Sequence, residues 1–356
     1  MTTETHVPYR LTRVGVVMTP AQGDPNEVEG VLNPGSGRGP DGELYLLPRL
    51  VAEGNVSRVG LARVVIEDGV PTSVEREGVV LEPDRGWERG VGNAGVEDPR
   101  VTRIETLGLH VMTYVAYGPL GPRTAIAVSS DLREWRRLGP ALFRYQDDLD
   151  MDLNLFHNKD TVFFPEPVTA PDGREALAVL HRPMWDLGET KPGQGVRVPA
   201  GVDDDERQSI WISYIPLAAV REDLSALTLW EQHRFVAGPE FPFEALKIGG
   251  GPPPRRVPEG WLVLHHGVTG VLESAFAQQQ KVNYAAGAII LDRDDPSKVV
   301  ARTPEPLLAP ETDDERSGIV PNVVFPTAIE EVDGRLFVFY GMADSKIGVA
   351  LLERTD

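Results

Sequence analysis

The chain has 356 residues, no cysteine and a formal net charge of −19 at pH 7. The absence of cysteine excludes disulfides, and the acidity argues against nucleic-acid binding, because a basic surface is needed to displace counterions from phosphates. No run of 18 apolar residues occurs, so we expect no membrane span, and residues 1–6 lack a basic and apolar leader, so we expect a cytoplasmic protein.

Residues 9–18 form the first predicted strand, and a two-part phrase then recurs five times. Each phrase opens with a turn-flanked apolar strand, at residues 42–47, 108–114, 174–180, 260–265 and 334–340. After a loop a second strand follows, at residues 58–63, 123–128, 209–214, 286–291 and 346–351. The opening strands start 66, 66, 86 and 74 residues apart. Such recurrence is typical of radial repetition and predicts an all-β fold, a five-bladed β-propeller.

No Gly/Ser-rich or Pro-rich linker divides the chain, so we predict one domain over residues 1–356. The last phrase ends five residues before the C-terminus, which leaves the fifth blade without outer strands. We therefore expect strand 9–18 to close the last blade and remove an open sheet edge. Residues just past each inner strand become the first candidates for chemistry.

The segment 95–102 contains two adjacent carboxylates, Glu97 and Asp98, followed by Pro99 and Arg100. Proline restricts the preceding residue, so we expect Asp98 in an extended conformation within a stiff loop. Two carboxylates beside an arginine can keep one acid protonated and the other ionised. An acidic turn capped by arginine is also commonly structural, so this motif alone leaves both readings open.

Cations gather around the third and fourth phrases. Lys159 precedes the third opening strand, and His181 and Arg182 follow it, a set that suits an anion or sugar hydroxyls. Lys247 begins a run of three glycines and three prolines, which lacks the Gly-Lys-Ser/Thr of a nucleotide-binding loop. His265 and His266 come later without a zinc-binding framework, so we expect no metal.

Asp344 falls, in the fifth phrase, where other blades place Arg182 and His266. Aromatic residues also stand at strand ends, where they suit either stacking against sugar rings or ordinary core packing: Tyr117, Trp185, Tyr284 and Tyr340.

Taken together, these phrases resemble glycoside hydrolase family 130, five-bladed propeller enzymes that act on β-mannosides. The matching pieces run in order along nearly the whole chain: Asn33-Pro34, Arg49, 57–60, 96–102, Lys159-Asp160, 164–166, 181–183, 247–253, 266–268, 287–288, 291–292, 295–296, 320–326, 340–341 and 343–344. The resemblance implies inverting phosphorolysis of manno-oligosaccharides to α-mannose 1-phosphate, with Asp98 as proton donor. Phosphate would be the nucleophile, so no second carboxylate is needed as base, unlike the ordinary inverting scheme.

The resemblance also implies the binding residues. The sugar would be held by Asn33, Arg49, Glu97, Arg100, Asp160, Arg182, His266, Tyr340 and Asp344, and the phosphate by Arg58, Lys159, His181 and Lys247. Partners would be a β-mannoside and inorganic phosphate as co-substrate, with no cofactor. A homo-oligomer is compatible with the sequence.

Two departures from the family pattern keep an inverting β-mannosidase as the alternative. Lys159 stands where arginine is expected in many phosphorylases, and lysine keeps the charge but loses the forked geometry. Residues 189–207, with the acidic run 203–206, are expected to form a loop over the mouth that repels phosphate or activates water. A non-catalytic glycan-binding propeller is a third reading, disfavoured because the blades differ in their pocket residues.

Overall fold

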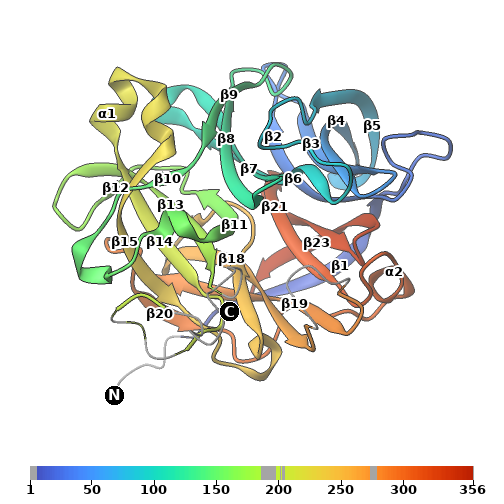
Figure 1. The fold of residues 1–356 in the computed structure, drawn as a ribbon. Helices are drawn as coiled ribbons and strands as arrows, with labels where there is room; N and C mark the ends of the chain where they lie inside the picture. Colours follow the sequence, from blue (N-terminus) through green and yellow to red (C-terminus); the bar gives the residue numbers. More distant parts are fainter. Residues whose placement is uncertain (1–5, 186–197, 201, 203–204, 273–278, 356) are drawn as a thin grey trace.

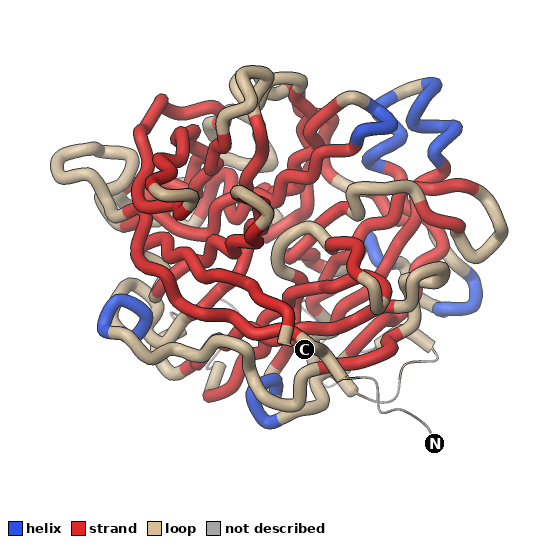
Figure 2. The backbone as a smooth tube through the Cα atoms, turned by 180° about the vertical axis from the view of Figure 1, so that it is seen from behind, coloured by secondary structure: helices blue, strands red, loops and turns tan. Residues whose placement is uncertain are grey.

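Strands dominate this protein, as the computed structural model of residues 6–185, 198–200, 202, 205–272 and 279–355 shows. The helices are short and lie at the outside of the molecule (Figure 2). Within the described residues they are α1 (Leu217–Glu222), α2 (Asp313–Arg316) and the single-turn helices η1 (Glu105–Leu107), η2 (Asp147–Leu149), η3 (Leu153–Leu155), η4 (Leu224–Thr228) and η5 (Pro242–Glu244). None of these described helices has the length and apolar character needed to cross a membrane.

The first sheet runs in the order β2-β3-β4-β6-β7-β8-β9, with β5 paired to β4. Its strands are β2 (Gly30–Arg38), β3 (Leu44–Ala52), β4 (Val56–Glu67), β5 (Val70–Leu81), β6 (Ala94–Ile104), β7 (Leu109–Gly118), β8 (Gly121–Ser129) and β9 (Arg136–Pro140). It consists of two antiparallel units, because β4 and β6 meet only through a short parallel contact that pairs Val56 with Ala94 and Ser57 with Gly95.

The other described strands form three further sheets. One contains β10 (Leu142–Phe143), β11 (His157–Phe163), β12 (Val168–Thr169), β13 (Glu175–Met184), β14 (Ile210–Pro216) and β15 (Leu229–Ala237). The next contains β16 (Lys247–Gly250), β17 (Arg255–Val257), β18 (Gly260–Gly270), β19 (Val282–Leu291) and β20 (Val299–Arg302). The last contains β1 (Tyr9–Met18), β21 (Val324–Val332), β22 (Arg335–Met342) and β23 (Lys346–Arg354).

The all-β prediction is confirmed, and both parts of each repeated phrase fall on strands. The opening parts lie in β3, β7, β13, β18 and β22, and the second parts lie in β4, β8, β14, β19 and β23. The predicted strand 9–18 is β1, which pairs antiparallel with β23 from Tyr9 opposite Arg354 to Met18 opposite Ile347. The two ends of the described chain therefore share one sheet.

The opening strand of each phrase is expected to be the inner strand of its blade, and the structure corrects this. A further strand precedes each of them, namely β2, β6, β11, β16 and β21, and these strands contact one another across units: β2 touches β6 and β21, β6 touches β11, and β11 touches β16. In Figure 1, β6, β11 and β21 lie near the middle of the view, whereas β5, β15 and β20 lie toward its edge. In the central strands β2, β6, β11, β16 and β21, bulges and polar or glycine residues interrupt the apolar pattern. The sequence pattern therefore does not predict them as strands.

The core lies between neighbouring sheets. Phe164, which follows β11, packs edge-on against Trp261 of β18 in the next sheet, with ring centroids 5.0 Å apart. Within one sheet, Trp185, just after β13, packs against Trp211 of β14 at 5.7 Å. All four side chains are almost fully buried. Large aromatic rings remove apolar area from water, and the Phe164–Trp261 contact also fixes how one sheet lies on the next. Most of the predicted loop over the mouth, within residues 189–207, lies outside the described residues.

Candidate active site

Three of the central strands carry the same irregularity. The pairing register shifts by a bulge between Leu32 and Gly35 in β2, between Glu97 and Arg100 in β6, and between Lys159 and Val162 in β11. Inside these bulges lie Asn33, Asp98 and Asp160, all in the left-handed region with φ of 42°, 45° and 52°. A bulge turns a side chain away from the regular alternation of a strand. The repeated bulge thus aims three polar side chains in a way that an uninterrupted strand would not.

Asp98 is therefore not extended, as the proline rule predicts, but left-handed. Its carboxylate oxygen Oδ1 accepts hydrogen bonds from Asn33 Nδ2 at 2.8 Å and from Arg49 Nη1 at 3.1 Å. These two bonds from neighbouring strands hold the bulged conformation against the preference imposed by Pro99.

Asp98 is ionised in the free protein. Burial alone raises the pKa of this carboxyl, but the charges of Arg49, Lys159 and Arg100, and the bond from Asn33, outweigh it and hold the pKa below its usual range. A carboxylate in this state can donate a proton only after it has gained one. An anion entering beside the same cations offsets their charge and so raises the pKa of Asp98.

Glu97 lies between two cations. Arg49 Nη2 donates to Glu97 Oε1 at 2.9 Å, and Lys159 Nζ stands 3.4 Å from Glu97 Oε2. Arg49 is fixed further by Ser57 Oγ at 2.8 Å and by Asn55 Oδ1 at 3.1 Å. The side chain of Glu97 is 4% exposed and that of Arg49 is 10% exposed. This buried, hydrogen-bonded ion pair is held in one position beside Asp98.

A second buried group forms around Asp160. Its Oδ2 accepts a hydrogen bond from Arg182 Nε at 2.6 Å and lies 3.4 Å from His266 Nε2. Burial opposes the charge of Asp160, but Arg182, His266 and Arg100 hold its pKa well below the usual range. His266 packs on Phe325 with ring centroids 4.3 Å apart. Burial lowers the pKa of His266 to about 4 despite Asp160, so its ring is neutral at pH 7.

The glycine run after Lys247 makes this group possible. A Cβ atom on Gly249 would stand 2.1 Å from Asp160 Oδ2 and 2.6 Å from the His266 ring. No side chain fits at that distance, so β16 passes the carboxylate closely only because position 249 is glycine.

Two buried guanidinium nitrogens in this region, Arg100 Nη2 and Arg182 Nη1, lack a hydrogen-bond partner among the described residues. His266 Nε2 faces Asp160 Oδ2 instead, at 3.4 Å. Lys247 Nζ lies 5.6 Å from the centre of the Tyr284 ring, and Tyr284 itself packs near His266 with centroids 5.7 Å apart. Unpaired buried donors are costly, and a bound anion satisfies them. These cationic groups therefore suit an anion.

Asp344 stands near the Asp98 group, on the turn between β22 and β23, where its φ is 48°. Burial, together with the negative charges of Asp98 and Glu97, raises its pKa to about 7, although Arg49 and Lys159 act in the opposite direction. Near pH 7 this carboxyl is therefore about half protonated, so it can either donate or accept a hydrogen bond.

The raised pKa predicts a pH-dependent stability. Between the ordinary value of 3.8 and about 7, folded Asp344 keeps a proton that the unfolded chain has lost, so the free energy of unfolding falls as pH rises through this range. Asp344→Asn removes that contribution. Urea denaturation of both proteins in phosphate-free buffer checks this, and stability curves that run parallel in pH would contradict the shift.

The structure does not bring three predicted residues into these groups. Tyr340 is buried and its hydroxyl donates to Glu315 Oε1 at 3.0 Å, so its sugar contact stays a prediction. His181 has both ring nitrogens engaged by Asn158 and Ser213, so it has no free group for phosphate. Arg58 follows Ser57 on β4, so strand alternation directs it to the face opposite Ser57. Its Nε is buried without a hydrogen-bond partner among the described residues, and its phosphate contact stays a prediction.

Tyr117 and Tyr284 were not among the binding residues predicted from the sequence, but each contacts a lysine of the site. Tyr117 lies under Lys159 with the ring centre 5.5 Å from Nζ, as Tyr284 lies beside Lys247. Each ring stabilises an ammonium group by a cation–π contact. Because both residues stand at strand ends, the sequence suggested sugar stacking for them. Their contacts with lysines on neighbouring strands could not be predicted from the sequence. Trp185, the third aromatic candidate, is core.

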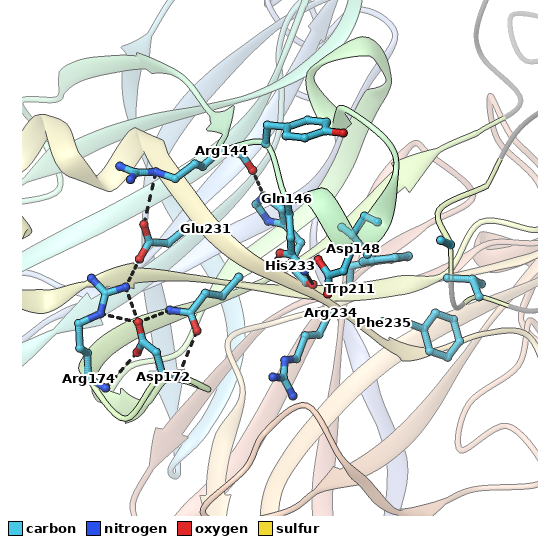
Figure 3. A pocket seen from close by; sticks show the side chains of 15 residues that line it. Arg144, Gln146, Asp148, Asp172, Arg174, Trp211, Glu231, His233, Arg234 and Phe235 are labelled. Carbon is cyan, nitrogen blue, oxygen red and sulfur yellow. Dashed lines mark hydrogen bonds and ion pairs between the residues drawn. The ribbon is translucent and has the colours of Figure 1, made fainter.

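A separate groove of about 680 Å³ runs along β15 and contains none of the predicted residues. Its wall is a network of Arg144, Glu231, Arg174 and Asp172, with Gln146 and His233 beside it (Figure 3). In the described residues no three histidine or acidic side chains gather as a metal site would need.

The chain is similar to known proteins over most of its length. The family model described as β-1,4-mannooligosaccharide phosphorylase matches residues 17–186 and 218–355. Two proteins of Thermoanaerobacter sp. (strain X514) are each 32% identical: a 1,2-β-oligomannan phosphorylase, over 74% of this chain and 69% of its own length, and a β-1,2-mannobiose phosphorylase, over 84% and 78%.

A solved structure shares the fold with a TM-score of 0.71 at 23% identity, covering 96% of this chain and 93% of its own. It was reported with the finding that the GH130 family of mannoside phosphorylases contains glycoside hydrolases that target β-1,2 mannosidic linkages in Candida mannan. The match of the family model over most of the chain confirms the resemblance seen in the sequence. This chain belongs to glycoside hydrolase family 130, the β-mannoside phosphorylase family.

Proposed function

We propose that the protein is an inverting phosphorylase that cleaves the β-mannosidic bond of manno-oligosaccharides with inorganic phosphate. The observation that carries this is the set of buried, unpartnered guanidinium nitrogens of Arg100 and Arg182. Water needs no such set, whereas phosphate must exchange its hydration shell for several convergent donors.

In the proposed reaction a phosphate oxygen attacks the anomeric carbon of the mannose from the face opposite the leaving group. The glycosidic C–O bond breaks, and the proton of Asp98 passes through a mannose hydroxyl to the leaving oxygen. The products are α-mannose 1-phosphate and the shortened sugar. Phosphate arrives already nucleophilic, so one carboxylic acid suffices where hydrolysis needs two.

The binding roles follow the two groups of residues. We assign the mannose to the Asp98 side, with Asn33, Arg49 and Asp344, and the phosphate to Arg182 and Lys247, near Asp160 and Tyr284. Lys159 Nζ lies 3.4 Å from Glu97 Oε2. Because this ammonium group is already paired with a carboxylate, we do not assign it as a main phosphate ligand. Phosphate entering here also supplies the negative charge that raises the pKa of Asp98 toward a proton donor.

The alternative is an inverting β-mannosidase, and Asp344 is the observation that favours it. A carboxyl with a pKa of about 7 close to Asp98 has the affinity for protons that a base for water activation needs. The hydrolases described with one similar structure keep this reading open.

One digestion separates the two functions. We expect β-1,2- or β-1,4-linked manno-oligosaccharides to release mannose 1-phosphate, and only when inorganic phosphate is present. Both linkages are tested because the family model names β-1,4 and the two relatives name β-1,2. If free mannose is released at the same rate with and without phosphate, the protein is a β-mannosidase and not a phosphorylase. No product under either condition would favour a binding protein.

We also propose that the five antiparallel units surround one axis as a five-bladed propeller, a single domain closed by β1. The contacts from β21 through β2, β6 and β11 to β16, and the pairing of β1 with β23, support this arrangement. A crystal structure in which the β16 unit stood apart from β21 would contradict it.

A further inference from the structure

A buried chain of hydrogen bonds crosses three neighbouring strands behind the active site. His181 Nε2 of β13 is 2.7 Å from Ser213 Oγ of β14, and that oxygen is 2.8 Å from His233 Nδ1 of β15. His233 Nε2 in turn lies 2.9 Å from the carbonyl oxygen of Arg144 at the wall of the β15 groove (Figure 3). The two histidines and the serine are each at most 2% exposed.

The direction of every bond in this chain is fixed by its outer end. A carbonyl oxygen only accepts, so His233 Nε2 carries the hydrogen, and in the neutral ring Nδ1 accepts from the Ser213 hydroxyl. The serine oxygen then accepts from His181 Nε2–H, which leaves His181 Nδ1 as an acceptor. That nitrogen is 3.0 Å from Asn158 Nδ2, a donor. Burial lowers the pKa of both histidines, which favours the neutral rings that this order requires.

The hydrogen-bond chain ends at Asn158, beside the bulge of β11. Asn158 immediately precedes Lys159 and the left-handed Asp160, whose φ is 52°. Such a conformation at a non-glycine residue costs about 1–3 kcal/mol and persists only where its surroundings hold it. On the far side of the bulge, the hydroxyl of Thr124 contacts that of Thr161 at 2.8 Å. The bulge is thus fastened on both sides by buried polar contacts.

We propose that His181, Ser213 and His233 are positioning residues, which act through Asn158 to hold the β11 bulge so that Lys159 and Asp160 face the active site. This inference rests on the proposed phosphorylase function, because Asp160 in turn orients Arg182, our main phosphate ligand. It gives His181 a role one step removed from phosphate. It also explains why three polar side chains lie in a core whose neighbours include Phe143 and Trp230.

Two substitutions of His181 separate the inner bond from the outer one. Asparagine places its carbonyl oxygen near the position of Nδ1 and can still accept from Asn158, but it loses Ser213. Glutamine places its amide nitrogen near Nε2 and can still donate to Ser213, but it leaves Asn158 without an acceptor. Both remove the aromatic ring, so each controls for the packing loss of the other.

We expect His181→Gln to raise KM for phosphate roughly tenfold or more, since small displacements of positioning groups are expensive, while His181→Asn stays close to the native KM. Both variants should lower the melting temperature by similar amounts. Equal KM values for the two variants would overturn the proposal. His181, Ser213 and His233 would then contribute only to core packing.

A second measurement does not depend on activity. In NMR spectra of the uniformly ¹⁵N-labelled protein, we expect the hydrogen of both histidine rings on Nε2. The backbone amide signals of Lys159 and Asp160 should move in His181→Gln more than in His181→Asn. A hydrogen on Nδ1 of either ring, or unmoved amide signals, would overturn the proposal. If instead the native enzyme proves indifferent to phosphate while these signals behave as expected, the proposed function fails and the positioning chain stands.

Discussion

Asp98→Asn should lower the turnover of manno-oligosaccharides by a factor of about 10² or more, the range for loss of a general acid. The amide cannot supply a proton to the leaving oxygen, yet it has nearly the same shape and can still accept from Asn33 and Arg49. The fold should therefore remain, which a circular-dichroism spectrum and a melting curve check alongside the rate.

The matched control is Asp294→Asn, an exposed aspartate on the turn after β19, which should keep native turnover. Near-normal activity of Asp98→Asn would remove Asp98 from the role of proton donor. Asp344 would then become the first carboxyl to examine.

Arg182→Met should lower the free energy of unfolding by roughly 3–5 kcal/mol, because it leaves the buried charge of Asp160 without its closest partner. The two side chains are 4% and 3% exposed and 2.6 Å apart, so water does not replace the lost contact. In the fraction that remains folded, KM for phosphate should also rise, since a proposed ligand has gone. Chemical denaturation and phosphate kinetics measure the two effects separately.

The control here is Arg10→Met, which breaks the ion pair with Glu353 at the surface, where the side chains are 63% and 37% exposed. Screened surface pairs contribute at most about 1 kcal/mol, so this variant should be nearly native. Equal losses in the two variants would mean that the buried pair does not hold the site together.

The strands that open each phrase were predictable because they are apolar and flanked by turns, and their pairing partners follow the same pattern. The central strands were not. In β6, for example, Glu97, Asp98, Pro99 and Arg100 occupy the middle of the strand, and no alternation of apolar residues remains to mark it. The bulge that makes these residues useful is also what hides the strand from a periodicity search.

The same limit applies to the site. Adjacent charges such as Glu97, Asp98 and Arg100 were found because they are close in sequence. The partners of His181 and Tyr340 come from other strands, and nothing in the local sequence tells a strand-end histidine that bonds Ser213 from one that faces a ligand. Arg58 and Ser57 show the sharpest case, since one residue of register sends a side chain to the opposite face of its sheet.

The pairing of β1 with β23 also sets a schedule for biosynthesis. Arg10 meets Glu353 across 343 positions of chain, so β1 has no pairing partner until β23 has been translated. At about 5–20 residues per second that wait is on the order of tens of seconds. During this interval β1 is an unpaired strand available to other chains, and its charged residues Arg10 and Arg13 are of the kind that discourages such pairing.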